Sequence, residues 1–281
     1  MSMSTPAEIA ELAASAGQNK SNLSAKKIIP LAILAGAYIG LAAIASTTAG
    51  AGWSEEWATS GFHKVLSAAP FTVGLILVIL AGAELFTGNN MYLTLAAMDR
   101  RCSWGQVLKN WLIVYIMNFV GALIPLGIVY FGGFLLQNGV LTAFGAKAVA
   151  TATAKVSMTW CEVFVRGIAC NWLVCLAVWM SLGAKDMAGK VLAIFPPIFT
   201  FVLCGFEHCI ANMYFIPAGI VAAQGSVPGL NWGSFFTANL IPATLGNIIG
   251  GAVFVAGFYW LSYLRKDKNN ASASKEQGIP Q

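Results

Sequence analysis

The residues in this chain most able to do chemistry are an acid and a histidine side by side. Glu207 and His208 lie in the stretch GFEHCIANMYFIPAG, residues 205–219, and no other Asp, Glu, Lys or Arg occurs between Lys190 and Arg265. An imidazole in apolar surroundings favours its neutral form unless an anion comes close. Such a ring can exchange a proton with a passing weak acid. The pair therefore predicts a proton-handling site inside an apolar segment.

A second stretch, GAELFTGNNMYLTLA at residues 82–96, repeats the first in outline: Glu84 is followed by the same Asn-Met-Tyr. A charge at the centre of a bilayer costs roughly 3 kcal/mol. Irregular backbone at that depth is tolerated only where it is buried in protein or lines a cavity. The two acids either only hold neighbouring helices together, or they mark two broken helices that meet at a transport site. We favour the second interpretation.

The composition is typical of a polytopic membrane protein. The 281 residues are 58% hydrophobic and 10% charged, and the mean hydropathy is +0.72. The net charge of +5 comes from short basic clusters between apolar segments, which membrane topology explains better than nucleic-acid binding. The six cysteines form no CxxC pair and predict no disulfide framework or zinc site. A metal site at Cys204 and Cys209, which flank the Glu–His pair, stays open as an alternative.

The apolar segments lie within residues 26–265, the expected transmembrane domain. Residues 1–25 form a polar segment with a weak amphipathic pattern, which predicts a short interfacial helix, and residues 266–281 form a polar tail expected to be disordered. Six apolar segments are predicted to cross the membrane: 28–51, 65–98, 110–136, 156–182, 191–223 and 232–264. The second is too long for one straight crossing and is interrupted at residues 84–90. We expect an all-α membrane protein with six transmembrane helices, the second and fifth broken.

Lysine and arginine predict the orientation, because cytoplasmic loops are enriched in them. The N-terminal segment, the connections after the second and fourth segments, and the tail together hold 12 of these residues. The opposite side holds three: Lys64, Lys147 and Lys155. Both termini are therefore expected on the cytoplasmic side of the cell membrane.

Asparagines indicate an internal repeat. Asn110 and Asn118 in the third segment match Asn239 and Asn247 in the sixth, both with an offset of 129 residues. Each half contains three spans, an odd number, so the second half must enter the membrane from the opposite face. The chain is therefore predicted to form two inverted three-helix repeats, an arrangement in which polar half-helix ends meet near the middle of the membrane.

The expected half-helix ends favour anions, because helix N-termini carry free N–H donors and partial positive charge. Lys155, expected at the outer start of the fourth segment, either adds a fixed positive potential or only extends to the interface. Thr87 and Asn171 are neutral hydrogen-bonding candidates near mid-membrane, or they satisfy helix backbone. His63, in the first outer loop, is expected to be solvated or interfacial.

These motifs resemble those of the formate/nitrite transporter family of pentameric anion channels, over almost the whole chain. The resemblance rests on four motifs: GAELFTGN (82–89), CNWLVCLAVW (170–179), GFEHCIANM (205–213) and GNIIGG (246–251). It implies an aquaporin-like protomer, a homopentamer and one pore per protomer. The motifs are slightly nearer to nitrite-type than to formate-type members, and relatives that conduct hydrosulfide also exist.

The resemblance also implies roles for individual residues. His208 would be the central pore histidine, with Thr87 as its hydrogen-bond partner and Glu207 beside it. Lys155 would raise the local positive potential, and Asn171 would be the asparagine of the central chamber. The apolar constrictions on either side of the histidine would be formed by Phe71, Leu75, Leu85 and Phe201.

The expected function is the pH-dependent passage of a small monovalent weak-acid anion such as formate or nitrite. A dry constriction opposes an anion more strongly than a neutral acid, so Lys155 would attract the anion and His208 would supply or relay a proton. A pore for water or glycerol would need neither residue. A membrane-bound redox enzyme would need haem ligands or a cysteine cluster, and one intramembrane histidine excludes bis-His ligation within a protomer. We expect a channel that has no enzymatic activity and no cofactor.

Overall fold

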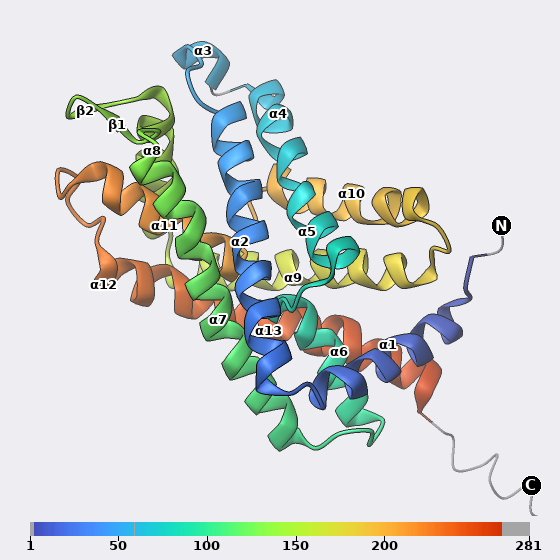
Figure 1. Cartoon of the computed structure of the whole chain (residues 1–281). Coiled ribbons are helices and arrows are strands. Elements are labelled where there is room, and N and C mark those ends of the chain that lie inside the picture. Colours follow the sequence, from blue (N-terminus) through green and yellow to red (C-terminus); the bar gives the residue numbers. More distant parts are fainter. Residues whose placement is uncertain (1–2, 59, 266–281) are drawn as a thin grey trace, which may run out of the picture.

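The computed structural model describes residues 3–58 and 60–265, and these residues are mainly helical (Figure 1). The α-helices are α1 (Pro6–Ser21), α2 (Ala25–Ala49), α3 (Glu55–Ala58), α4 (Gly61–Phe71), α5 (Val73–Leu77), α6 (Phe86–Met98), α7 (Trp104–Phe131), α8 (Ala143–Val156), α9 (Trp160–Gly183), α10 (Met187–Leu203), α11 (Cys209–Ala223), α12 (Trp232–Ser234) and α13 (Ile241–Ile249). Four stretches are π-helical: η1 (Val78–Gly82), η2 (Phe235–Leu240), η3 (Gly250–Gly257) and η4 (Trp260–Leu264). Strands β1 (Leu136–Gln137) and β2 (Val140–Leu141) form an antiparallel hairpin.

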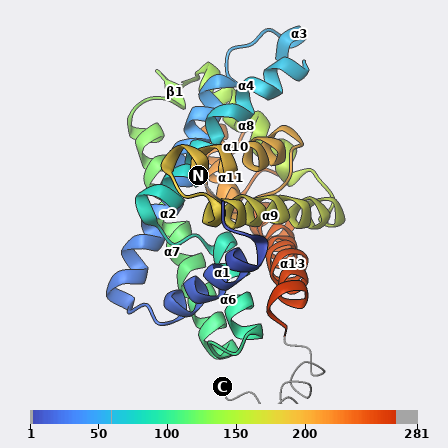
Figure 2. The same cartoon turned by 90° about the vertical axis from the view of Figure 1, so that its right-hand side faces the viewer.

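Five helical stretches of the described chain are long and apolar enough to cross a membrane: Ala25–Ala49, Gly61–Gly82, Trp104–Phe131, Trp160–Gly183 and Trp232–Leu264. The fifth segment predicted from the sequence is divided between α10 and α11, which are apolar but only 17 and 15 residues long. The chain is therefore a helical membrane protein with five spans by length, where six were predicted. In Figures 1 and 2, α3 lies at one end of the molecule and α1 towards the other. We refer to these ends as the α3 side and the α1 side.

Both predicted helix breaks are present, and each has a glycine with positive φ close to its start. The first helix stops at Gly82 (φ 82°) and the chain becomes helical again at Phe86. The second break contains Gly205 (φ 67°), and α11 begins at Cys209. Glycine adopts such φ values without the steric cost that other residues carry. The first break is shorter than predicted, because the expected interruption at residues 84–90 lies mostly inside α6.

One asparagine side chain closes each break, which is why the helices resume so soon. Asn118 Oδ1 accepts the Phe86 N–H at 2.9 Å, and its Nδ2 donates to the carbonyls of Ala32 and Glu84 at 2.7 and 2.9 Å. Asn247 makes the same three bonds in the second half, with Cys209, Gly167 and Glu207. Unpaired backbone groups are costly in an apolar region. The asparagines thus satisfy the backbone where helical bonding is interrupted.

The polar N-terminal segment forms α1, which packs on α6 (Figure 2). Gly17 allows this contact, since a Cβ at that position would come within 2.0 Å of the Tyr92 carbonyl oxygen. Arg101, just after α6, donates to Glu11 at 2.6 Å and to Ser15 at 2.9 Å. The bond from the Arg101 guanidinium lowers the pKa of the Glu11 carboxyl. The expected interfacial helix is therefore fastened to the rest of the protein.

Glycines bring α2 and α7 into close contact. A Cβ at Gly36 would lie 2.0 Å from the carbonyl oxygen of Asn118, and a Cβ at Gly121 would lie 2.0 Å from that of Ile33. Small residues at such positions let two helix backbones approach closely inside a membrane. This contact holds Asn118 where it can close the first break.

We expect Gly121→Val to prevent accumulation of folded protein. The new side chain would collide with backbone, which cannot move aside as a flexible side chain can, and overpacking of this kind costs about 3 kcal/mol or more. Gly127→Val is the matched control, because a Cβ at Gly127 on the same helix meets nothing within 4 Å. Yields of monodisperse protein in size-exclusion chromatography would test this. Equal yields of the two variants would show that the close contact is dispensable.

Candidate functional site

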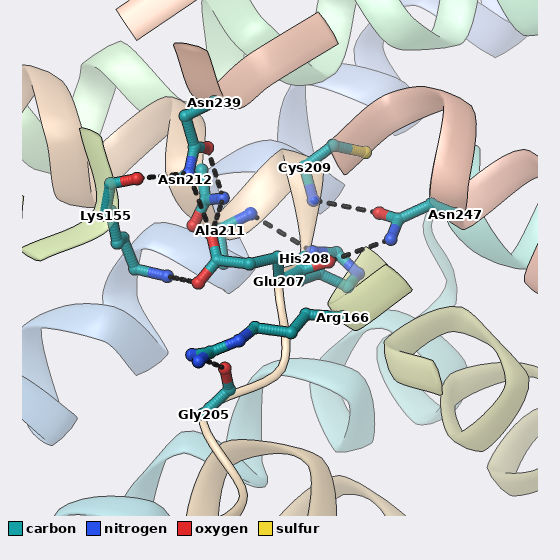
Figure 3. Close-up of polar contacts among 10 residues, drawn as sticks. All are labelled: Lys155, Arg166, Gly205, Glu207, His208, Cys209, Ala211, Asn212, Asn239 and Asn247. Atoms are coloured by element: carbon teal, nitrogen blue, oxygen red, sulfur yellow. Dashed lines mark hydrogen bonds and ion pairs between the residues drawn. The ribbon is translucent and has the colours of Figure 1, made fainter. Parts of the chain in front are cut away.

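His208 lies at the second break and is the N-cap residue of α11 (Figure 3). It is only 3% exposed. Its Nδ1 accepts the Ala211 N–H at 3.1 Å, and a ring nitrogen that accepts a hydrogen bond carries no proton. The proton of the neutral ring is therefore on Nε2, which lies 3.0 Å from Oγ1 of Thr87. His208 thus donates to the Thr87 hydroxyl and joins the two broken helices.

Glu207 forms a buried ion pair with Lys155. Lys155 Nζ lies 2.7 Å from Glu207 Oε1, and the two side chains are 16% and 3% exposed. The second carboxylate oxygen accepts from the side-chain amides of Asn212 and Asn239, at 2.7 and 3.0 Å (Figure 3). A buried charge is tolerated when it is paired and hydrogen-bonded in this way. The carboxylate is therefore engaged in holding Lys155 in place.

An equivalent cluster surrounds Glu84 in the first half of the chain. Lys20 Nζ lies 2.6 Å from Glu84 Oε1. Asn89 donates to the other carboxylate oxygen and to Asn110 Oδ1, both at 2.9 Å. In each cluster the lysine ammonium also lies over an aromatic ring, that of Tyr92 or Phe215. The repeat indicated by the asparagines therefore extends to two complete lysine–glutamate–asparagine clusters.

The two lysines differ from the sequence prediction. Lys155 lies in the last turn of α8 and not at the start of the next span, because Thr159 caps α9 and that helix begins only at Trp160. Lys20 was counted only among the basic residues that predict the orientation of the chain in the membrane. Each lysine precedes an N-cap residue, Ser24 or Thr159, by four positions. From this shared spacing, the sequence could have identified Lys20 as the counterpart of Lys155.

Two cavities lie near opposite ends of α2. A cavity of about 510 Å³ on the α1 side is lined in part by Lys20 and Glu84. A cavity of about 200 Å³ on the α3 side is lined in part by Lys155 and His208. Both members of the first pair therefore border a cavity, whereas in the second pair only Lys155 does, together with His208.

The four predicted constriction residues are buried, and they divide between the two cavities. Phe71 and Phe201 line the α3-side cavity with their rings 5.7 Å apart at 87°, and the Phe201 ring stacks on His208 at 5.9 Å. Leu75 and Leu85 line the α1-side cavity. The apolar side chains expected on either side of the histidine thus occur as one pair in each cavity.

Asn171 is fully buried and is not among the residues that line either of these cavities. Its Nδ2 donates to the carbonyls of Thr87 at 3.1 Å and Asn247 at 2.7 Å. These bonds match the alternative in which Asn171 satisfies helix backbone. They also fix α6 at Thr87, the partner of His208.

The second histidine, His63, contacts the end of a helix and lies away from the breaks. A solvated or interfacial His63 was expected, and its side chain is buried, because α4 folds back over the end of α2 and places His63 Nε2 3.0 Å from the Gly50 carbonyl oxygen. Cys204 is exposed and Cys209 is buried. Among residues 3–58 and 60–265, no group of three His, Cys, Asp or Glu side chains is arranged to hold a metal ion.

Apolar spans, two broken helices and two charged clusters beside cavities define this molecule as a membrane transport protein. Residues 7–261 match the family model described as formate/nitrite transporter. The chain therefore belongs to the formate/nitrite transporter family.

Similar proteins are named as transporters and channels. The chain is 40% identical to a probable formate transporter of Methanothermobacter thermautotrophicus, over 94% of this chain and 99% of the relative. It is 39% identical to the formate channel FocA of Escherichia coli strain K12, over 94% and 96% of the two chains. A solved structure of a pentameric formate channel with formate bound matches with a TM-score of 0.74 and 35% identity, over 85% of this chain and 98% of that one.

Proposed function

We propose that this protein is a pH-dependent channel for small monovalent weak-acid anions, with formate as the first candidate. The observation that carries the proposal is the duplicated lysine–glutamate cluster together with a single His208–Thr87 contact. Each cluster places a lysine beside a cavity, and the single histidine supplies a group that can exchange a proton with a weak acid. Formate is placed before nitrite because similar proteins include a probable formate transporter and a formate channel.

The proposed assembly is a homopentamer in the cell membrane, with one pore per protomer and both termini cytoplasmic. The solved pentameric relative supports the assembly, and the basic residues support the orientation. The matched clusters support six crossings arranged as two inverted, aquaporin-like repeats. In this proposal residues 26–265 form the channel and 1–25 the N-terminal segment. The predicted tail, 266–281, lies outside the described residues.

Permeation would combine electrostatic attraction with protonation. An anion that loses water in the apolar layer gains proton affinity, because low dielectric disfavours its charged form. The neutral His208 ring can donate from Nε2. To pass that proton on fully, it must take another proton at Nδ1, which would release the Ala211 N–H. Proton transfer would therefore be linked to the N-cap of α11.

Flux measurements in proteoliposomes test this function. We expect saturable formate flux that rises as the pH falls, compared side by side with nitrite and hydrosulfide. A pore for neutral solutes would instead conduct water or glycerol with no response to formate concentration or pH. Protein-free liposomes provide the baseline. Formate, nitrite and hydrosulfide fluxes all equal to that baseline would contradict the proposal.

A further inference from the structure

The ion pair leaves the α3-side cavity with little net charge from Lys155. Its ammonium lies 2.7 Å from the Glu207 carboxylate, and the fields of two opposite charges this close largely cancel at a distance. A second lysine, Lys147, lines the same cavity. In the part of the chain that the structure describes, the Lys147 ammonium has no hydrogen-bond or ion-pair partner. Among the described residues that line this cavity, Lys147 therefore carries a positive charge without a partner.

The spacing of residues on α8 places Lys147 in the same cavity as His208. Lys147, Thr151 and Lys155 are four residues apart, so they share one face of the helix, and all three line the α3-side cavity. The Thr151 hydroxyl, like the Lys147 ammonium, has no partner among the described residues. This face of α8 therefore carries the unpaired Lys147 ammonium and the unpaired Thr151 hydroxyl, both on the N-terminal side of the paired Lys155.

The Lys147 side chain is held in place by its stem. A Cβ at Gly50 would lie 3.0 Å from Lys147 Cε and 2.8 Å from Ser67 Oγ, so the stem packs over the end of α2. Burial lowers the pKa of the Lys147 ammonium, and a bound anion would act in the opposite direction. The ammonium does not donate to the last carbonyls of α2, which would be the ordinary role of a lysine near a helix C-terminus.

We propose that Lys147 and Thr151 form an anion-binding site on the α3 side, which takes a small monovalent carboxylate such as formate before it reaches Lys155 and His208. The site rests on the anion-channel function proposed above and is the first place at which the anion binds. It also assigns the recruitment of anions to Lys147, leaving Lys155 paired with Glu207.

Formate flux in proteoliposomes tests the site through a charge-removing variant, Lys147→Gln. We expect the formate concentration for half-maximal flux to rise on the order of fivefold, because one unit of local potential is lost. Maximal flux should be retained, and the difference from wild type should shrink at high salt. Lys147→Arg keeps the charge, and Lys64→Gln removes an exposed charge outside the lining of this cavity. Both should match wild type.

A binding measurement separates failure of the site from failure of the function. Sodium formate should raise the Tm of the detergent-solubilised wild type and of Lys64→Gln, and this rise should be lost in Lys147→Gln. If wild type shows the rise but conducts no formate, the site stands and the channel function fails. If wild type conducts and Lys147→Gln matches it in both measurements, the site is overturned and the function stands. If wild type neither conducts nor responds, both are overturned.

Discussion

His208→Asn is expected to yield folded channels whose formate flux no longer rises as the pH falls from about 8 to about 5, because asparagine cannot take up and release a proton. Asparagine is a good N-cap residue, so its side-chain oxygen can replace Nδ1 as acceptor for the Ala211 N–H. Asparagine cannot exchange a proton with a passing weak acid. The variant thus removes proton exchange and keeps the cap of α11.

The measurement is the pH profile of formate flux in proteoliposomes that contain equal amounts of wild-type and variant protein. His63→Asn is the matched control, since the chain has two histidines and His63 lines neither cavity near the breaks. The control should keep the wild-type profile. If His208 served only to cap α11, His208→Asn would also keep the wild-type profile, and the proton-relay role would be rejected.

Acidic and polar residues inside the apolar segments made much of the fold predictable. Glu84, Glu207 and His208 interrupt long uncharged runs, and the cost of burying such groups requires a local reason for their presence. The structure places a break at each acid and the histidine on one N-cap. The matched asparagines, Asn110 and Asn239, also occur in equivalent clusters.

The partners of those groups were not predictable to the same degree, because the contacts are distant in sequence. Lys20 pairs with Glu84 across 64 positions and Lys155 with Glu207 across 52. The sequence around a lysine in a polar segment does not show whether the lysine is solvated or pairs with a buried acid. The break at residues 84–90 was predicted too long for a related reason. Its closure depends on Asn118, which is supplied by another helix.

Glu207→Gln is expected to destabilise the protein by about 3–5 kcal/mol, the usual cost of leaving one buried charge without its partner. The substitution keeps the shape of the side chain and leaves Lys155, with 16% of its side chain exposed, without a counter-charge. The experiment compares the free energy of unfolding in detergent with that of wild type. The contact of Lys155 with the α3-side cavity gives its ammonium some access to water, which favours the lower end of this range.

The double variant Lys155→Met with Glu207→Gln should recover most of the lost stability. Methionine replaces the apolar stem of Lys155 without its charge, and the glutamine oxygen can still accept from Asn212 and Asn239. Replacing a whole buried pair is often neutral, whereas breaking it is not. A double variant as unstable as Glu207→Gln would show that the carboxylate stabilises the protein through its asparagines alone. Recovery would show that folding does not require the two charges, and that the instability of Glu207→Gln comes from the unpaired Lys155 ammonium.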